Sequence, residues 1–196
     1  MKILAVQNRM GIGDTVIFLP YIKALSEKFN SPISLLVKEN SKADQFLYQT
    51  KYIDKILVLE DDNKNSNRHS GFLGGIKLIE DLNKYNFDKI FIFNSSFRFY
   101  LISKFSRISE VYQYPLFQKR NQHITDTPKK FIKDKLNLEI SEDPVIQIDD
   151  KLSSEWIEKF QINKNEMNIL LGVGGSGPTK RIPAKIFLSV IDKISN

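Results

Sequence analysis

The chain has 196 residues, of which 41% are hydrophobic and 27% charged, enough apolar material for one globular domain and part of a second. Its longest apolar runs are about five residues, far short of the roughly 18 that cross a bilayer. We expect neither a membrane span nor a secretory signal. The absence of cysteine excludes disulfides, thiolate metal sites and a cysteine nucleophile. It suits a reducing compartment, so we expect a cytoplasmic protein.

The net charge of +6 comes from interspersed charges rather than one basic block, and it only weakly favours anionic partners. No RNA-binding or helix-turn-helix signature is present, so we expect no nucleic-acid partner. The acidic run Glu60-Asp61-Asp62 resembles clusters that hold a divalent cation. Its Asn, Lys and Ser neighbours are typical of a hydrated loop, and the chain has two histidines. We therefore expect no metal site.

Strand and helix patterns alternate along the chain. Short apolar runs predict extended segments at residues 2–7, 33–37, 55–59, 87–93, 110–114, 145–148 and 167–173. Helical spacing of apolar residues predicts helices at 16–29, 42–48, 72–85, 97–105, 127–136, 153–160 and 184–194. The run 87–93 is apolar on both faces and belongs inside the sheet, whereas 110–114 suits an edge. This order predicts an α/β fold with a Rossmann-like parallel sheet.

We place a domain boundary near residue 150. Residues 1–150 then form one Rossmann-like domain, and residues 151–196 form a linker helix and the first strand–helix unit of a second Rossmann-like domain. A single such unit leaves one sheet edge unpaired. Either the chain is a fragment, or that edge is covered by the first domain or by self-association with a second copy.

The first glycine loop follows the first strand. Gly11 and Gly13 allow a tight turn and the close approach of a ligand to the backbone. A dinucleotide-binding fingerprint requires a third glycine where Val16 stands. Glu39, after the second strand, can still play the part of the ribose-binding acid, so NAD binding stays open as an alternative.

Two polar side chains are predicted at the carboxyl ends of strands. Asp14 either caps the following helix or presents a carboxylate where open α/β sheets bind ligands. Arg98 follows the strand 87–93 and should face the same cleft as Asp14. There it would hold a phosphate or carboxylate; otherwise it is a surface charge.

The second glycine loop, residues 172–183, carries Ser176, Thr179 and Lys180 between a strand and a helix. Backbone N–H groups at a helix start, hydroxyl donors and a lysine suit a diphosphate. The loop is not a P-loop, because the Gly-Lys-Ser/Thr ending is missing. A solvated basic turn is the equally weighted alternative.

Three segments together resemble glycosyltransferase family 9, the bacterial ADP-heptose:lipopolysaccharide heptosyltransferases of GT-B fold. These segments are residues 1–25 with Gly11-Ile12-Gly13-Asp14, residues 87–98 ending Asn94-Ser95-Ser96-Phe97-Arg98, and residues 174–183 with Lys180-Arg181-Ile182-Pro183. Ile182 stands where the family commonly has Trp. The resemblance covers the family's first domain and the start of its second.

The resemblance implies an inverting, metal-independent transfer of heptose from ADP-heptose to the lipopolysaccharide inner core, with no cofactor. It implies that Asp14 is the general base, and that Lys180, Ser176 and Thr179 bind the donor phosphates. Gly11, Gly13 and Arg98 fall on the acceptor side, in the domain of residues 1–150. The implied partners are an ADP-sugar and an anionic Kdo-bearing lipid A acceptor, so the protein would be peripheral at the inner membrane. We expect these 196 residues alone to be inactive.

The rival function is a non-catalytic Rossmann-like module that binds a nucleotide or a glycan. A coding sequence that continues beyond Asn196 would favour the enzyme, and a stop codon there would favour the binding module. Calorimetric binding of NAD that depends on Glu39 would instead support the nicotinamide alternative.

Overall fold

A computed structural model describes residues 1–9, 11–61, 67–116, 123–141, 143–174 and 181–194. The chain divides into two compact units, Met1–Ile148 and Asp149–Asn196, and each is described by itself. Among the described residues, no helix has the length and apolar character that crossing a membrane requires.

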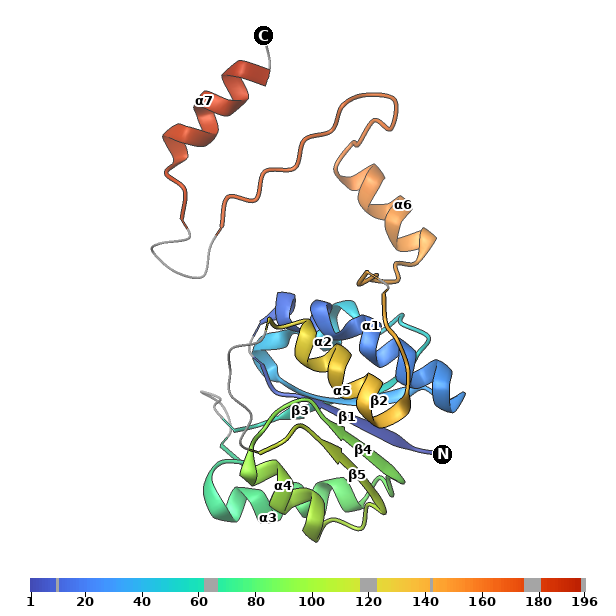
Figure 1. Ribbon diagram of the computed structural model, residues 1–196. Coiled ribbons are helices and arrows are strands. Elements are labelled where there is room, and N and C mark those ends of the chain that lie inside the picture. Colours follow the sequence, from blue (N-terminus) through green and yellow to red (C-terminus); the bar gives the residue numbers. More distant parts are fainter. Residues whose placement is uncertain (10, 62–66, 117–122, 142, 175–180, 195–196) are drawn as a thin grey trace. The chain divides into compact units, whose positions relative to one another are not determined.

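A five-stranded parallel sheet forms the centre of the first unit (Figure 1). Its strands are β1 (Ile3–Gln7), β2 (Ile33–Lys38), β3 (Ile53–Leu59), β4 (Lys89–Ile92) and β5 (Glu110–Gln113), in the order β3-β2-β1-β4-β5. The prediction of a Rossmann-like parallel sheet is confirmed. The run 87–93 contains an interior strand, and 110–114 contains an edge strand, as the apolar patterns predicted.

Helices cover both faces of this sheet (Figure 1). One face carries α1 (Ile12–Phe29), α2 (Ala43–Phe46) and α5 (Asp126–Leu136), and a short 3-10 turn, Glu39–Ser41, follows β2. The other face carries α3 (Gly71–Asn83) and α4 (Phe97–Phe105). Pro20 lies buried inside α1, where it has no backbone N–H to donate to the helix.

Alternate side chains of β1 enter the two halves of the core. Ile3 and Ala5 face α1 and α5, and Leu4 and Val6 face α3 and α4, as the two-residue period of a strand requires. All five residues of β1 are buried, and each large apolar side chain contributes about 1.5–3 kcal/mol of burial. The strand is therefore held on both faces, and the loop that follows it leaves from a fixed point.

Aromatic side chains close the core beneath α1 and α5. The rings of Phe93 and Phe131 lie 5.6 Å apart, and those of Tyr114 and Phe131 lie 4.9 Å apart, both edge to face. The rings of Phe91 and Tyr112 stack at 4.6 Å. Such pairs add to burial by about 0.5–1.5 kcal/mol each. They hold the ends of β4 and β5 at a fixed distance from α5.

The described residues of the second unit include the helices α6 (Asp150–Lys159) and α7 (Ala184–Ile194), close to where helical spacing predicted them. Asp149 caps α6, because its Oδ1 accepts hydrogen bonds from the backbone N–H groups of Lys151 and Leu152, at 2.6 and 3.3 Å.

The predicted buried strand at 167–173 is wrong for this chain. Within residues 143–174, which the structure describes, no strand is formed, and Leu170 is 97% exposed. The apolar pattern is present, but a strand also needs a neighbour to accept its hydrogen bonds. The segment at 145–148 is likewise not part of a sheet, although its Gln147 side chain accepts a hydrogen bond from the Lys51 N–H.

Candidate active site at the carboxyl edge of the sheet

The carboxyl ends of β1 and β4 lie side by side at the centre of the sheet. Val6 pairs with Ile92, and the N–H of Phe93 donates to the carbonyl of Val6 at 3.0 Å. Beyond this point the chain turns from β1 into α1 on one face and from β4 into α4 on the other. Open α/β sheets bind ligands where the connections diverge in this way. The candidate site is therefore built from the β1–α1 loop and the β4–α4 turn.

The β1–α1 loop is fixed by its own backbone and by Gln7. The Gln7 side chain is only 2% exposed, and its Oε1 accepts a hydrogen bond from the Arg9 N–H at 2.9 Å. Gly11 has φ 110°, a conformation that side chains with a Cβ rarely adopt. The Thr15 hydroxyl donates to the Gly11 carbonyl at 3.3 Å. The loop therefore depends on glycine at position 11 for its shape.

Asp14 lies in the first turn of α1 and is half-buried. The cap position belongs to Gly11, and no side chain caps the helix, so the cap interpretation of Asp14 is wrong. Its Oδ2 lies 3.6 Å from the place that a Cβ on Gly11 would occupy. Among the described residues, none forms a hydrogen bond or ion pair with the Asp14 carboxylate. The carboxylate is thus not used in holding the loop together.

Gly13 differs from Gly11. Its backbone is not in the left-handed region, and a Cβ built on it would meet nothing within 4 Å. The fold therefore does not require glycine there. Open space above the first turn of α1 leaves room for a ligand to approach the backbone.

The β4–α4 turn is held by β5. Asn94 Oδ1 accepts a hydrogen bond from the Ser96 N–H at 3.0 Å. Gln113, the last residue of β5, donates through Nε2 to the carbonyls of Asn94 and Ser96, at 3.2 and 2.9 Å. Two side-chain amides thereby fix the direction in which α4 begins.

Several buried polar atoms at this edge lack a partner within the described part of the chain: Gln7 Nε2, Asn94 Nδ2, Gln113 Oε1 and Tyr114 Oη. Burial, with a smaller effect of nearby Tyr21, raises the pKa of Tyr114 and keeps its phenol neutral. Unpaired buried groups are costly and are tolerated where a fold serves a site. The sequence analysis missed the two glutamines and Tyr114. A Gln at the end of each strand, Gln7 in β1 and Gln113 in β5, is the signal that could have found them.

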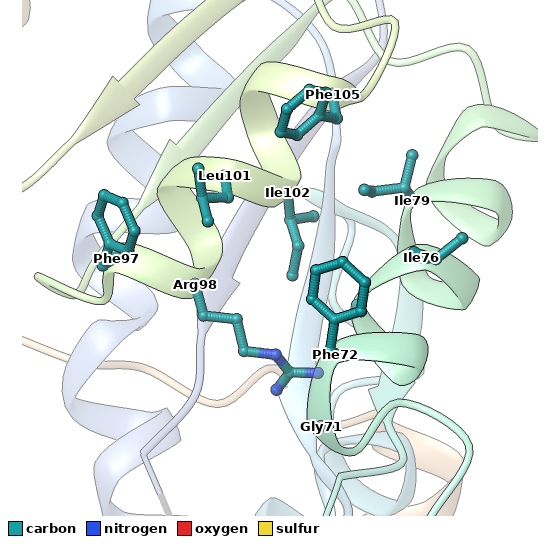
Figure 2. A pocket seen from close by; sticks show the side chains of 10 residues that line it. Gly71, Phe72, Ile76, Ile79, Phe97, Arg98, Leu101, Ile102 and Phe105 are labelled. Carbon is teal, nitrogen blue, oxygen red and sulfur yellow. The ribbon is translucent and has the colours of Figure 1, made fainter.

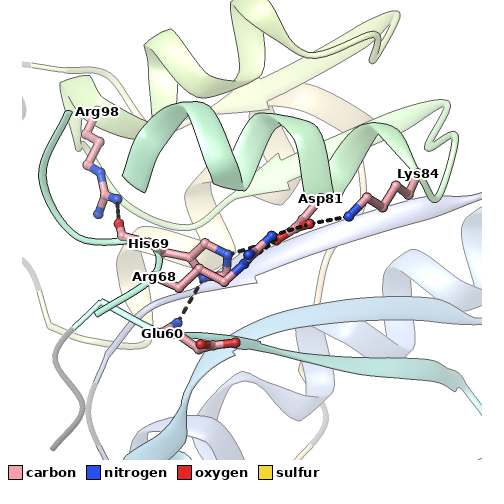
Figure 3. A network of polar contacts seen from close by, with 6 residues as sticks. All are labelled: Glu60, Arg68, His69, Asp81, Lys84 and Arg98. Atoms are coloured by element: carbon pink, nitrogen blue, oxygen red, sulfur yellow. Dashed lines mark hydrogen bonds and ion pairs between the residues drawn. The ribbon is translucent and has the colours of Figure 1, made fainter. Parts of the chain in front are cut away.

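Arg98, the second residue of α4, turns toward the segment before α3 (Figures 2 and 3). Its Nη2 donates to the carbonyl of His69, and its Nη1 lies 3.8 Å from Asp61 Oδ2. Asp61 also lies 3.3 Å from Lys38 Nζ. The structure thus links Arg98 to Asp61 and His69 rather than to Asp14. Its side chain is 33% exposed, and its predicted part in acceptor binding stays a prediction.

A polar network fixes the segment that holds Arg98 (Figure 3). His69 Nδ1 accepts from the Glu60 N–H at 3.1 Å, and its Nε2 lies 3.2 Å from Asp81 Oδ2. Arg68 and Lys84 donate to the same carboxylate, at 2.8 and 2.7 Å. Burial raises the pKa of Asp81, but these hydrogen bonds outweigh it and hold the pKa well below its ordinary value. Asp81 is therefore an ionised anchor for the segment.

The proposed donor-binding residues Ser176, Thr179 and Lys180 lie outside the described residues. Their position relative to Asp14 stays a prediction.

Solved structures of similar fold are known. The crystal structure of the glycosyl transferase family 9 from Veillonella parvula DSM 2008 superposes with a TM-score of 0.74 at 18% identity, covering 98% of this chain and 59% of that one. The structure of E. coli ADP-heptose lps heptosyltransferase II superposes with a TM-score of 0.61 at 18% identity, covering 98% of this chain and 62% of that one. The structure of E. coli heptosyltransferase WaaC with ADP-2-deoxy-2-fluoro heptose superposes with a TM-score of 0.58 at 12% identity, covering 100% of this chain and 66% of that one. No protein-family model and no curated protein matches the sequence.

At these identities the likeness shows the fold. The chain has the α/β architecture of the solved glycosyltransferase structures and spans about six-tenths of their length, between 59% and 66%.

Proposed function

We propose that this chain is the acceptor-binding part, with the beginning of the donor-binding part, of a glycosyltransferase of the heptosyltransferase type. The transfer runs from ADP-heptose to the lipopolysaccharide inner core. The observation that carries the proposal is the Asp14 carboxylate, without a partner among the described residues, at the carboxyl end of β1. It lies where the sheet connections diverge, in a fold shared with family 9 glycosyltransferase structures.

In this proposal Asp14 is the general base. Its carboxylate takes the proton of the acceptor hydroxyl while that oxygen forms a bond to the anomeric carbon of the donor. The bond between the anomeric carbon and the diphosphate oxygen breaks on the opposite side, so the configuration inverts and ADP leaves. A carboxylate that the first turn of α1 positions, and that has no hydrogen-bond partner among the described residues, suits this role, because it can accept the proton without breaking such a contact.

The departing diphosphate needs positive charge and hydrogen-bond donors. We assign these to Lys180, Ser176 and Thr179, with no metal ion and no cofactor in the reaction. We assign the acceptor side to Gly11, Gly13 and Arg98, in the unit Met1–Ile148. The open space at Gly13 and the shape that Gly11 gives the loop support this assignment, since both leave the first turn of α1 accessible.

The acceptor in this proposal is the Kdo-bearing, phosphorylated inner core of lipid A. Such an acceptor lies at an anionic membrane surface, and the net charge of +6 suits it. The protein would therefore work on the cytoplasmic face of the inner membrane as a peripheral enzyme.

A transfer assay tests the proposal directly. ADP-heptose and Kdo-bearing lipid A are incubated with the 196-residue chain and, separately, with the whole protein that its reading frame encodes. We expect transfer by the whole protein and little or none by the 196 residues alone. Transfer by the short chain would contradict the assignment of an incomplete donor site. Glycan or nucleotide binding by the whole protein without any transfer would favour a binding module.

The alternative of NAD binding is tested by a calorimetric titration of the chain and its Glu39→Gln variant with NAD. Glu39 begins the 3-10 turn after β2, where a dinucleotide fold places its ribose-binding acid. We expect no NAD binding. Tight binding that the variant loses would contradict the transferase proposal.

A further inference from the structure

Two side-chain amides at the β4–α4 turn each leave one polar atom unpartnered. Asn94 Nδ2 is a hydrogen-bond donor and Gln113 Oε1 is an acceptor, and both atoms are buried without a partner within the described part of the chain. The side chains that carry these atoms are half-buried. The two atoms therefore lie just beneath the surface of the carboxyl edge, where a ligand reaches them once the side chains above them shift.

The other polar atom of each amide is already used, and this decides which atom is left over. Asn94 Oδ1 accepts from the Ser96 N–H at 3.0 Å, so the Asn94 N–H groups are left over. Gln113 Nε2 donates to the carbonyls of Asn94 and Ser96, so the Gln113 oxygen is left over. Exchanging O and N in either amide would break these hydrogen bonds. The turn thus offers one donor and one acceptor, both uncharged.

Both amides border the same short stretch of chain. Ile92 of β4 and Val111 of β5 pack on the side of the sheet that α3 and α4 cover. The two-residue period of a strand places Gln113, the last residue of β5, on that side as well. Ile92 pairs with Gln113, and Asn94 follows Ile92 by two residues. A single sugar ring at this turn can therefore meet both amides.

A hydroxyl group is the ligand that suits this pair of atoms, because it accepts one hydrogen bond and donates another. An ionised phosphate or carboxylate oxygen only accepts, so it would place a negative charge against the Gln113 oxygen. Arg98, four residues after Asn94, has the Asp61 carboxylate 3.8 Å from its Nη1, which offsets its charge. The chemistry of the turn favours an uncharged polar ligand over an anion.

We propose that Asn94 and Gln113 recognise hydroxyl groups of the acceptor sugar. Asn94 Nδ2 donates to a hydroxyl oxygen, and Gln113 Oε1 accepts a hydroxyl hydrogen. The inference rests on the proposed function, and it names residues that select the uncharged part of the acceptor. Such a site rejects a ligand that lacks the hydroxyls, because the buried polar atoms would then stay unpaired.

Nuclear magnetic resonance of the isotope-labelled 196-residue chain tests this inference. The probe is the methyl glycoside of Kdo, a soluble fragment of the proposed acceptor, and inorganic phosphate is the comparison ligand. We expect the side-chain amide signals of Asn94 to shift, with saturation, when the glycoside is added. Phosphate alone should leave these signals in place.

Three variants separate recognition from folding. Asn94→Asp keeps an oxygen for the Ser96 N–H but offers a ligand no N–H, and Asn94→Ser does the same without adding charge. Each should weaken glycoside binding by about tenfold or more, as expected for the loss of one buried hydrogen bond. The urea midpoint of both should stay at the wild-type value. Gln113→Glu keeps Oε1 but loses the donor that holds the turn, so its urea midpoint should fall.

The matched control is Asn83→Asp. Asn83 Oδ1 also accepts a backbone N–H, from Arg107 at 2.8 Å. Asn83 is the last residue of α3 and precedes β4, so it lies toward the amino edge of the sheet, away from the turn. This variant adds the same charge as Asn94→Asp, and we expect it to bind the glycoside as the wild type does.

The inference would be overturned if the glycoside left the Asn94 signals unmoved, or if both Asn94 variants bound it with wild-type affinity. A urea midpoint that fell in both Asn94 variants as far as in Gln113→Glu would make Asn94 structural only. Phosphate that shifted the Asn94 signals would identify an anion site instead. Because no sugar donor is present, binding and transfer are measured separately. Glycoside binding that depends on Asn94, in a whole protein that transfers nothing, would count against the proposed function alone.

Discussion

The chain contains the same sequence pattern twice, and only the first copy becomes a strand and a helix. Residues 3–29 and residues 167–194 each consist of an apolar run, a glycine-rich loop and an amphipathic helix. In the first copy, β1 pairs with β2 and β4, and its residues are buried. In the second, α7 forms, but residues 167–173 are exposed, apart from the half-buried Leu171, and join no sheet.

The difference between the two copies shows that helix formation and strand formation depend on different contacts. The backbone hydrogen bonds of helix α7 lie within the helix, so they need no partner segment. A strand depends on neighbours, and β1 has them because residues 33–38 and 89–92 supply two. The catalytic proposal depends on the first copy, since its strand fixes the position of Asp14.

The largest expected difference in stability is between two leucine-to-alanine variants, one in each copy of the pattern. Leu4→Ala in β1 should lower the free energy of unfolding by about 2–5 kcal/mol, because Leu4 is fully buried. Leu170→Ala should change it by less than about 0.5 kcal/mol. Urea denaturation followed by circular dichroism measures both. A similar loss in both variants would show that the second apolar run is packed, and the comparison would fail.

The next largest expected difference is in how the two glycine loops tolerate alanine. Gly11→Ala forces a Cβ into a backbone with φ 110° and should cost about 1–3 kcal/mol of unfolding free energy. Gly174→Ala, whose Cβ would meet nothing within 4 Å, should leave stability unchanged within about 0.5 kcal/mol. Denaturation curves of the two variants decide this. Equal stability would mean that the first loop is not held in the left-handed conformation.

Acid should weaken the first unit through Asp81. The pKa of Asp81 is below its ordinary value of 3.8 in the folded chain, so its stabilising contribution is complete above that pH and is lost as the pH falls below it. Asp81→Asn should cost about 1–2 kcal/mol at neutral pH. The difference from the wild type should shrink on acidification, as measured by urea denaturation at several pH values. A constant difference would exclude this role for the carboxylate.

A small effect on stability is expected at Asp14. Because its carboxylate has no partner among the described residues, Asp14→Asn should change the unfolding free energy by less than about 1 kcal/mol, the size of a helix-dipole contribution. Asp44→Asn, in the first turn of α2, is the matched control. If Asp14→Asn lowered the unfolding free energy by about 2 kcal/mol or more, the loss would exceed a helix-dipole contribution, and Asp14 would have a structural role.

Much of the first unit could be predicted from the sequence, because its signals are local. The apolar runs that contain β1 and β4 and the helical spacing of α3 and α4 identified these elements, and their alternation predicted a parallel sheet. The position of Asp14 between the first strand and the first helix, at the carboxyl edge of the sheet, could be predicted for the same reason. Whether it caps α1 depended on the backbone of Gly11, which the sequence alone leaves free.

Contacts between distant residues could not be predicted in this way. Arg98 meets a carbonyl 29 residues earlier, and Gln113 holds a turn 17 residues before it. Neither pairing follows from spacing within one element. The outward-facing phenylalanines of α3 and α4 illustrate the same limit, since helical spacing does not show which apolar side chains the core leaves exposed.

The most direct test of the central claim is the turnover of an Asp14→Asn variant of the whole encoded protein, assayed with ADP-heptose and Kdo-bearing lipid A. If Asp14 takes the proton of the acceptor, kcat should fall by about 10²–10⁴-fold while the KM for the donor changes little. The Asp44→Asn protein should keep full activity. Undiminished turnover by a folded Asp14→Asn enzyme would contradict the account.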